Sequence, residues 1–531
     1  MSPHGFALAS AAAYTREIAS NGMQAAVGLE RSGGRVKGVR ARWDRLFRLT
    51  PEASGSLQSQ IRQMIVAAIA GRHLMPGDPV PSSRELSEIL GVARNTVVLA
   101  YQQLIDEGLL ISEERSGCFV NPDTKSGWAA EAPTRMSPDA TPRREPDWGR
   151  RIAQQLSTQR NIAKPLNWQR HPYPFVCGQF DPSLFPLADW RECSRMALGV
   201  SEVRDWAPDL VDGDDPLLIE QLRTRILPRR GVFAAPEEIM VTVGAQQALF
   251  IVAELLLTGR SIVGMEDPGY ADARNIFARQ TRNLLPMSID DGGVTISESV
   301  ADCDLICITP GHQSPTTATL LPERRQALMR LASEHDFLIV EDDYEIETSF
   351  GGQPEPALKS EDRDGRVLYI GSLSKTLAPG LRLGYMVAAP ALIKEARSLR
   401  RLMVRHPPSN NQRAAALFLS LGHHDALLHR MMHVLKRRAE TLAAALDLHM
   451  PEFEARGGKG GSSFWLRGPE GLDARKLAAA ALQEGIVIEP GDVFFSDETA
   501  GRSFFRLGFS SIPQERIEPG IAKLVRLATA S

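Results

Sequence analysis

From residue 175 onward, apolar strands alternate with amphipathic helices, and this alternation limits the region to an α/β fold with a doubly wound sheet. Polar or charged clusters follow several of the strands. In open α/β sheets, ligands bind beyond the carboxyl ends of the strands. The sequence therefore predicts a ligand site along one edge of the sheet.

The most specific cluster follows the apolar strand 367–370 and contains Ser372, Ser374, Lys375 and Arg382. Hydroxyls and a guanidinium beside one lysine suit a phosphate ester whose aldehyde is held as an imine. That chemistry describes pyridoxal 5'-phosphate on a catalytic Lys375. A lone Ser-x-Ser-Lys would fit a solvated surface lysine equally well, but the whole string 371–385 favours the cofactor.

Two further strand ends offer groups to the same cofactor. Gly244, Ala245 and Gln246 lie between a strand and a helix, where backbone N–H groups can hold a phosphate. Tyr270 follows the next strand and can stack on a planar pyridine ring. Each signal is weak alone, because many such turns carry glycine and an isolated tyrosine is often half-buried core.

Asp342 and Tyr344 follow the apolar strand 337–340. An acid at that place can pair with a protonated pyridine nitrogen, which keeps the cofactor an electron sink, and Tyr344 is expected near the ring's phenolic oxygen. The acid could instead cap a helix or join an ion pair. Arg506 alternates with apolar residues in a strand, where it either pairs a buried acid or grips a ligand carboxylate through two hydrogen bonds.

The N-terminal region carries a helix-turn-helix pattern. Ser82 and Glu85 form a capping box that opens a helix over 83–90, which Gly91 closes, and a second helix is predicted over 94–107. The N-terminus of the second helix enters the major groove in such units. Here it carries three side chains that suit guanine, adenine or phosphate, namely Arg94, Asn95 and Thr96.

Two short apolar segments, 109–111 and 118–120, predict a hairpin wing after the second helix, with Arg115 near its tip. An ordinary helical hairpin with surface arginines is the alternative interpretation of the whole region. The net charge of the chain is only −3, so any DNA-binding surface must be local.

Composition narrows the remaining possibilities. The five cysteines have no C-x-x-C spacing, which predicts a reduced, cytoplasmic chain without structural zinc, and His312 has no partner ligand at useful spacing. No apolar run is long enough for a bilayer, and the first residues do not resemble a signal peptide. We expect no metal and no membrane contact.

The predicted organisation has four parts. Residues 1–42 form a flexible extension, or alternatively a DNA-contacting arm, and 43–121 the DNA-binding domain. Residues 122–174 have a linker composition, and 175–531 form the cofactor-binding domain.

The segments 81–86, 90–97 and 101–108 resemble the winged helix of GntR-type regulators. In that family the residues that match Arg84, Arg94 and Thr96 contact DNA. The C-terminal clusters resemble fold-type I aminotransferases, which implies a large sheet domain and a small C-terminal α/β subdomain. The roles of the matching residues in that family agree with those given above for Lys375 and Asp342, and the resemblance implies that Arg506 binds the carboxylate of the effector.

The aminotransferase resemblance has one departure, since Ser314-Pro315-Thr316-Thr317 stands where aminotransferases carry Asn-Pro-Thr-Gly. The order of the two domains, with 309–313 and 341–344, resembles the MocR subfamily of GntR regulators. This resemblance implies a head-to-tail homodimer that binds a double-stranded DNA operator.

The resemblance also implies regulation by a small amino compound or by pyridoxal phosphate itself. One alternative is an active aminotransferase with a vestigial N-terminal domain. Another is a DNA-binding sensor that no longer binds cofactor.

Overall fold

The computed structural model describes residues 43, 46, 47, 49, 56–113, 116–123, 146–345, 355–458 and 460–529. The chain divides into two compact units, Met1–Arg151 and Ile152–Ser531. The predictions for residues 1–42, for Arg115 and for most of the linker before residue 146 lie outside the described residues.

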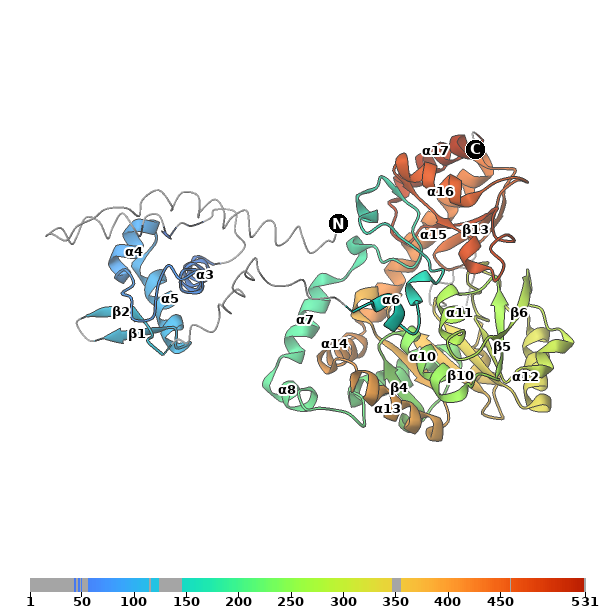
Figure 1. Cartoon of the computed structure of the whole chain (residues 1–531), viewed down its shortest axis with the longest axis horizontal. Coiled ribbons are helices and arrows are strands. Elements are labelled where there is room, and N and C mark those ends of the chain that lie inside the picture. The colour runs from blue at the N-terminus through green and yellow to red at the C-terminus, as the bar shows by residue number, and fades with distance from the viewer. Residues whose placement is uncertain are drawn as a thin grey trace. The chain divides into compact units, whose positions relative to one another are not determined.

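The first unit is a winged helix (Figure 1). Its helices are α3 (Leu57–Ala70), α4 (Ser83–Leu90) and α5 (Arg94–Asp106), and its wing pairs β1 (Leu110–Glu113) with β2 (Gly117–Val120). The Ser82 hydroxyl accepts a hydrogen bond from the Glu85 N–H at 3.2 Å, and Gly91 ends α4 with φ of 65°. These local signals explain why the predicted helix boundaries agree closely with the structure.

The second unit contains an eight-stranded sheet in the order β4-β11-β10-β9-β8-β5-β6-β7. The strands β4, β5, β6, β8, β9 and β10 run parallel, whereas β11 and β7 are antiparallel to their neighbours. Their bounds are β4 Ile239–Thr242, β5 Ile262–Asp267, β6 Asn283–Asp290, β7 Gly293–Val294, β8 Leu305–Ile308, β9 Leu338–Asp343, β10 Val367–Ser372 and β11 Gly384–Val387.

Helices cover both faces of this sheet, because successive strand residues point to opposite sides. Met240 and Ile370 pack in a core with α10 and α13, whereas Ile239 and Tyr369 pack in another with α9 and α14. The helices of this part are α7 Leu187–Ala197, α8 Val200–Trp206, α9 Pro216–Gln221, α10 Ala245–Leu256, α11 Ala271–Phe277, α12 Pro322–His335, α13 Pro390–Val404 and α14 Ser409–Ser420. The predicted α/β class is confirmed.

A smaller subdomain follows the long helix α15 (His423–His449) and appears in red in Figure 1. Its sheet has the order β12-β13-β16-β15, and α16 (Ala474–Gln483) and α17 (Ile517–Thr529) pack beside it. The four strands are β12 Glu454–Arg456, β13 Ser463–Arg467, β15 Glu489–Pro490 and β16 Phe504–Gly508.

The end of the expected linker belongs to this unit. Trp168 is buried, and β3 (Tyr173–Pro174) pairs with β14 (Ile486–Val487) of the small subdomain. Composition alone did not indicate this packing, because a Pro- and Arg-rich stretch has no regular period.

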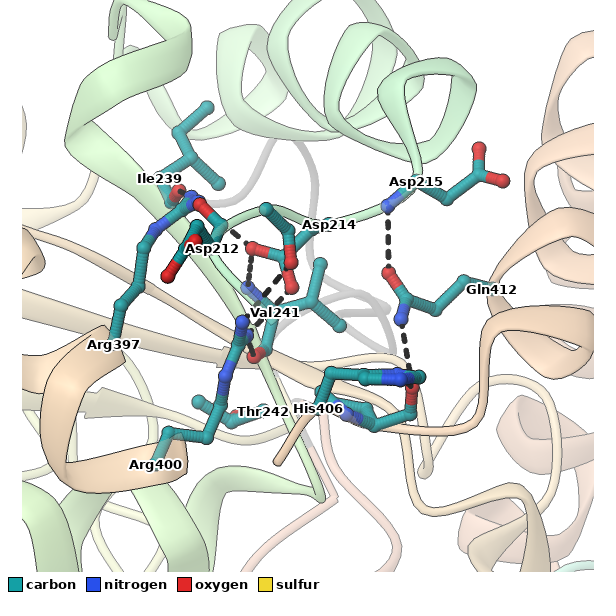
Figure 2. Close-up of polar contacts among 12 residues, drawn as sticks. Asp212, Asp214, Asp215, Ile239, Val241, Thr242, Arg397, Arg400, His406 and Gln412 are labelled. Atoms are coloured by element: carbon teal, nitrogen blue, oxygen red, sulfur yellow. Dashed lines mark hydrogen bonds and ion pairs between the residues drawn. The ribbon is translucent and has the colours of Figure 1, made fainter. Parts of the chain in front are cut away.

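A buried polar network joins the loop before α9 to the large sheet (Figure 2). The Asp214 carboxylate pairs with Arg400 at 2.5 Å and with Arg397 at 3.1 Å, and both arginines lie on α13. Gln412 of α14 accepts from the Asp215 N–H at 3.0 Å. The network fixes this loop against β4.

Candidate functional site

Lys375 lies in the turn after β10, beside the ends of the parallel strands. It is half-buried, and a Cβ atom at Gly178 would clash with its Nζ. Lys375 and Glu345 line two neighbouring pockets, one of which also includes Ser372 and Tyr344 and the other Gly178 and Ser462. The lysine amine therefore faces open space between several strand ends.

Asp342 is the buried acid of this region. It lies near the end of β9, opposite Ile370 of β10, and only 5% of its surface is exposed. Its Oδ1 atom has no hydrogen-bond partner among the described residues. Burial raises the pKa of Asp342 to about 7, with a further rise from Asp343, while the Lys375 amine opposes the rise.

Several of the groups that were predicted to bind the phosphate lie at the start of α10. Gly244 precedes the helix with φ of 75°, Ala245 begins it, and the side chain of Gln246 is exposed. The Arg382 Nη2 atom donates to the Val243 carbonyl at 3.2 Å, and a Cβ at Gly244 would lie 2.6 Å from it. A helix N-terminus beside a guanidinium suits an anion.

Tyr270 lies directly before α11, and its hydroxyl donates to Asp272 at 3.1 Å. Burial raises its pKa; Asp342 adds to that rise and Arg382 opposes it, so both groups are close to the ring. Of the remaining predicted groups, Ser372 accepts from the Ser374 N–H at 3.2 Å, and the Ser374 hydroxyl donates to the Leu383 carbonyl at 3.3 Å.

The loop that departs from aminotransferases has a defined structure. Gln313 is 1% exposed, and its amide donates to Glu266 at 3.2 Å and to the Pro268 carbonyl at 2.9 Å. Gln313 is thus used within the protein. Burial raises the pKa of Tyr344, and the nearby Ser314 side chain opposes that rise. The nearby His312 ring is buried, which lowers its pKa, although Glu345 opposes that effect.

Glu266 was missed by sequence reasoning. It is 7% exposed at the end of β5 and accepts from the Thr309 hydroxyl at 2.6 Å. Burial raises its pKa to about 7, and its charge contributes to the raised pKa of Asp342. Its position near a strand end was the only available signal.

Arg506 is buried in β16 and pairs with Glu489 of β15. Its Nε and Nη2 atoms lie 2.8 and 2.7 Å from the same carboxylate oxygen. Burial disfavours the charged form of both groups, but each charge stabilises the other. The pKa of Glu489 therefore lies below its usual value, and the pKa of Arg506 lies above its usual value. Arg506 thus pairs with a buried acid, which is one of the two roles that the sequence offered, and it also lies close enough to Tyr344 to affect its pKa.

The described residues of the first unit place the predicted DNA contacts at one end of α5. Arg94 and Asn95 are exposed and Thr96 half-buried, and no side chain caps this helix N-terminus. Arg94 Nε donates to the Ser83 hydroxyl at 3.3 Å, and Arg84 lies 3.6 Å from Glu88 on α4. Arg94, Asn95 and Thr96 thus lie in the first turn of α5, and Arg84 lies in the first turn of α4.

The described residues lack two kinds of feature. They contain no group of three His, Cys, Asp or Glu side chains arranged to hold a metal ion. Their helices include none with the length and apolar character needed to cross a membrane.

Residues 214–524 match the family described as aminotransferase class I and II, a family that depends on pyridoxal phosphate. Residues 57–120 match the bacterial regulatory proteins of the gntR family. Among solved structures, the chain resembles LysN, an α-aminoadipate aminotransferase from Thermus thermophilus complexed with N-(5'-phosphopyridoxyl)-L-leucine. The TM-score is 0.64 with 27% identity, over 72% of this chain and 98% of that one.

Whole-length relatives combine the two parts. The HTH-type transcriptional regulator TauR of Rhodobacter capsulatus is 42% identical over 482 residues, which cover 90% of this chain and 98% of that protein. The probable rhizopine catabolism regulatory protein MocR of Rhizobium meliloti is 30% identical over 484 residues, which cover 90% of this chain and 94% of that protein.

Proposed function

This chain belongs to the MocR subfamily of GntR-type transcription regulators, and on that basis we propose that a small amino compound controls its DNA binding by occupying a pyridoxal phosphate site at Lys375. The free cofactor is the second candidate effector. The observation that carries the proposal is the buried Asp342 carboxylate with its unpartnered Oδ1 close to the Lys375 amine. Buried polar atoms need partners, and a protonated ring nitrogen would supply one.

The residues present fit the cofactor. Lys375 would hold its aldehyde, Asp342 its ring nitrogen, and the start of α10, with Ser372, Ser374 and Arg382, its phosphate. Tyr270 would stack on the ring, and Tyr344, supported by Ser314, would contact the ring oxygen. When bound, pyridoxal phosphate supplies an aldehyde that reacts reversibly with amines and a ring that withdraws electrons.

The chain's own residues would then select the effector. Arg506 would bind its acid group, and the Lys375 amine, once released, would remain beside it to accept or return a proton. Ligand binding changes DNA affinity only as far as the ligand prefers one conformation of the protein. A head-to-tail homodimer with two winged helices would bind two half-sites of an operator through Arg84, Arg94, Asn95 and Thr96.

Lys375→Ala tests the proposal. The pure wild-type protein should be yellow, and this variant should lose the visible band, whereas Lys394→Ala, which changes an exposed lysine on α13, should keep it. Operator DNA selected with the wild-type protein should still bind Lys375→Ala, but amines should no longer change the affinity. An unchanged visible band in Lys375→Ala would refute the assignment.

The alternative function, aminotransferase catalysis, is favoured by the likeness to solved aminotransferases. We expect negligible steady-state transamination, because Gln313 is used within the protein and the loop lacks the usual asparagine. Turnover with an amino acid and a keto acid near a typical enzyme's roughly 10 per second would establish the alternative.

A further inference from the structure

Glu489 pairs with two basic side chains from distant parts of the chain. One carboxylate oxygen receives Arg506, as described above, and the other lies 3.3 Å from the Lys164 Nζ atom and 3.3 Å from the Cys177 backbone nitrogen. Glu489 is only 2% exposed. This Lys164–Glu489–Arg506 cluster therefore contains two positive charges and one negative charge, mostly shielded from water.

Glu489 also sets the orientation of the Arg506 guanidinium. It engages the edge formed by Nε and Nη2, while the guanidinium carbon lies 4.7 Å from the centre of the Phe494 ring. Within the described part of the chain, Nη1 contacts no acceptor. The guanidinium is thus locked on one edge and open on the other, which suits one further anionic group.

Lys164 lies in the segment through which the chain enters the second unit. It also donates to the Cys177 carbonyl, next to Gly178 and the Lys375 amine. Arg160, four residues earlier, donates to the carbonyls of Phe495 and Ser496 at 2.9 Å each. This segment is therefore fastened to Glu489 and to the turn that follows Phe494, the two supports of Arg506.

We propose that Lys164 and Glu489 are part of the effector site, and that they link Arg506 to the segment leading to the DNA-binding unit. The inference rests on the proposed function and specifies its ligand as an amino compound with one singly charged acid group. Without Lys164, Glu489 would cancel the charge of Arg506, so the attraction for the acid group would fall. A ligand acid at the open edge of Arg506 would offset part of the guanidinium's positive charge, so that Glu489 then depends more on Lys164 and holds the segment more firmly.

A pair of matched probes tests this role. Aminooxyacetate and methoxyamine each form a C=N bond from their amino nitrogen to the cofactor's aldehyde carbon and release the Lys375 amine, with no oxidation or reduction. Only aminooxyacetate carries a carboxylate. The ratio of their rates, followed as loss of the visible band, measures recognition of the acid group. Damage to the pocket that affects both probes cancels in this ratio.

In the wild-type protein we expect aminooxyacetate to react about tenfold faster or more, from the attraction of one buried guanidinium. Lys164→Gln should lower this preference at least about threefold, and Arg506→Gln should remove most of it. Lys523→Gln, which alters a half-exposed lysine 3.7 Å from Glu484, is the matched control and should keep the wild-type ratio.

Hydrogen–deuterium exchange of the full-length protein provides the second measurement. Aminooxyacetate, but not methoxyamine, should slow exchange in residues 152–177 of the wild type, and Lys164→Gln should abolish that difference. Wild-type rate ratios and wild-type slowing in Lys164→Gln would overturn the inference. A wild-type protein that lacks the visible band would instead refute the proposed function.

Discussion

Two buried arginines of the second unit, Arg400 and Arg506, each pair with a buried carboxylate, yet they differ in how their remaining donors are used. Arg400 gives Asp214 one hydrogen bond and gives others to the carbonyls of Val241 and Gly213 at 2.6 and 3.0 Å (Figure 2). Arg506 places two donors on Glu489 and leaves Nη1 without an acceptor in the described structure. Arg400 also has one donor without a partner, Nε, but that atom is fully buried. Burial and ion pairing are common to both, so they do not identify a ligand-binding arginine.

The comparison indicates that a remaining donor beside a pocket is the more informative feature. Arg400 connects α13 to β4 and the loop before α9, and its role is to hold the fold together. Arg506 lies close enough to Tyr344 to affect its pKa, and Tyr344 lines the pocket at Lys375, where an open donor is useful. We expect the first arginine to matter for stability and the second for ligand selection.

The largest effect should follow from Asp214→Asn. This change leaves Arg397 and Arg400 without their shared carboxylate, and breaking a buried ion pair costs about 3–5 kcal/mol of unfolding free energy. Denaturant unfolding measures the loss. Asp212→Asn is the matched control, because Asp212 is 94% exposed and lies 3.9 Å from Arg401, so the cost should be about 0–1 kcal/mol. Equal effects of the two changes would contradict the structural role of the buried cluster.

The sequence predicted the features that depend on local chemistry. Ser82, Gly91 and the turn at Gly244 act on neighbouring residues, so their patterns determined helix boundaries directly. The strand-end rule also placed Lys375, Asp342 and Tyr270 in one region, because parallel strands end at the same edge.

The cluster around Glu489 could not be predicted in the same way. Lys164 and Glu489 are separated by 325 positions, and Lys164 lies in a stretch whose composition indicated a linker. Their contact depends on the docking of that stretch against β14 and β15, which no local period encodes. The sequence pattern around Arg506 left both alternatives open, because the position of an arginine in a strand indicates neither the acid with which it pairs nor the donors that stay free.

Arg94 extends the comparison to an arginine with no acid partner among its described contacts. Arg94→Ala should weaken operator binding by about 1–3 kcal/mol if the side chain contacts a guanine, and the loss should depend on sequence. If Arg94 contacts phosphate, the loss should be uniform and the salt dependence should decrease. Binding titrations at several salt concentrations separate the two cases, and unchanged operator affinity would exclude a DNA contact.

Arg506→Lys addresses the other side of the comparison. Lysine keeps the charge but loses the planar fork, so a ligand with a carboxylate should bind about tenfold weaker, or about 1.4 kcal/mol. Absorbance titration with amino acids, paired with operator binding, measures this loss. If the variant responds like the wild type in both measurements, the effector is not held by a carboxylate at Arg506, and the cofactor itself becomes the leading candidate.

The last prediction concerns Asp342, which carries a buried carboxylate without the arginine that Asp214 and Glu489 each have. Its pKa in the folded protein is about 7, against an ordinary value of 3.8, so the folded state binds the proton more tightly than the unfolded state. Stability of the cofactor-free protein should therefore fall as the pH rises from about 4 to 7, because the carboxylate must ionise in a buried place.

Asp342→Asn has no proton to lose and should escape this fall. Without cofactor, the variant should melt near the wild-type temperature at pH 4 and above it at pH 8, with a shift of only about 2–4 °C for each kcal/mol. Cofactor should reverse the order at pH 8, since a protonated ring nitrogen gives the wild-type carboxylate its missing partner. Melting curves with and without pyridoxal phosphate measure both differences. If the difference in melting temperature between variant and wild type changes neither with pH nor with cofactor, Asp342 ionises without cost and does not hold the ring.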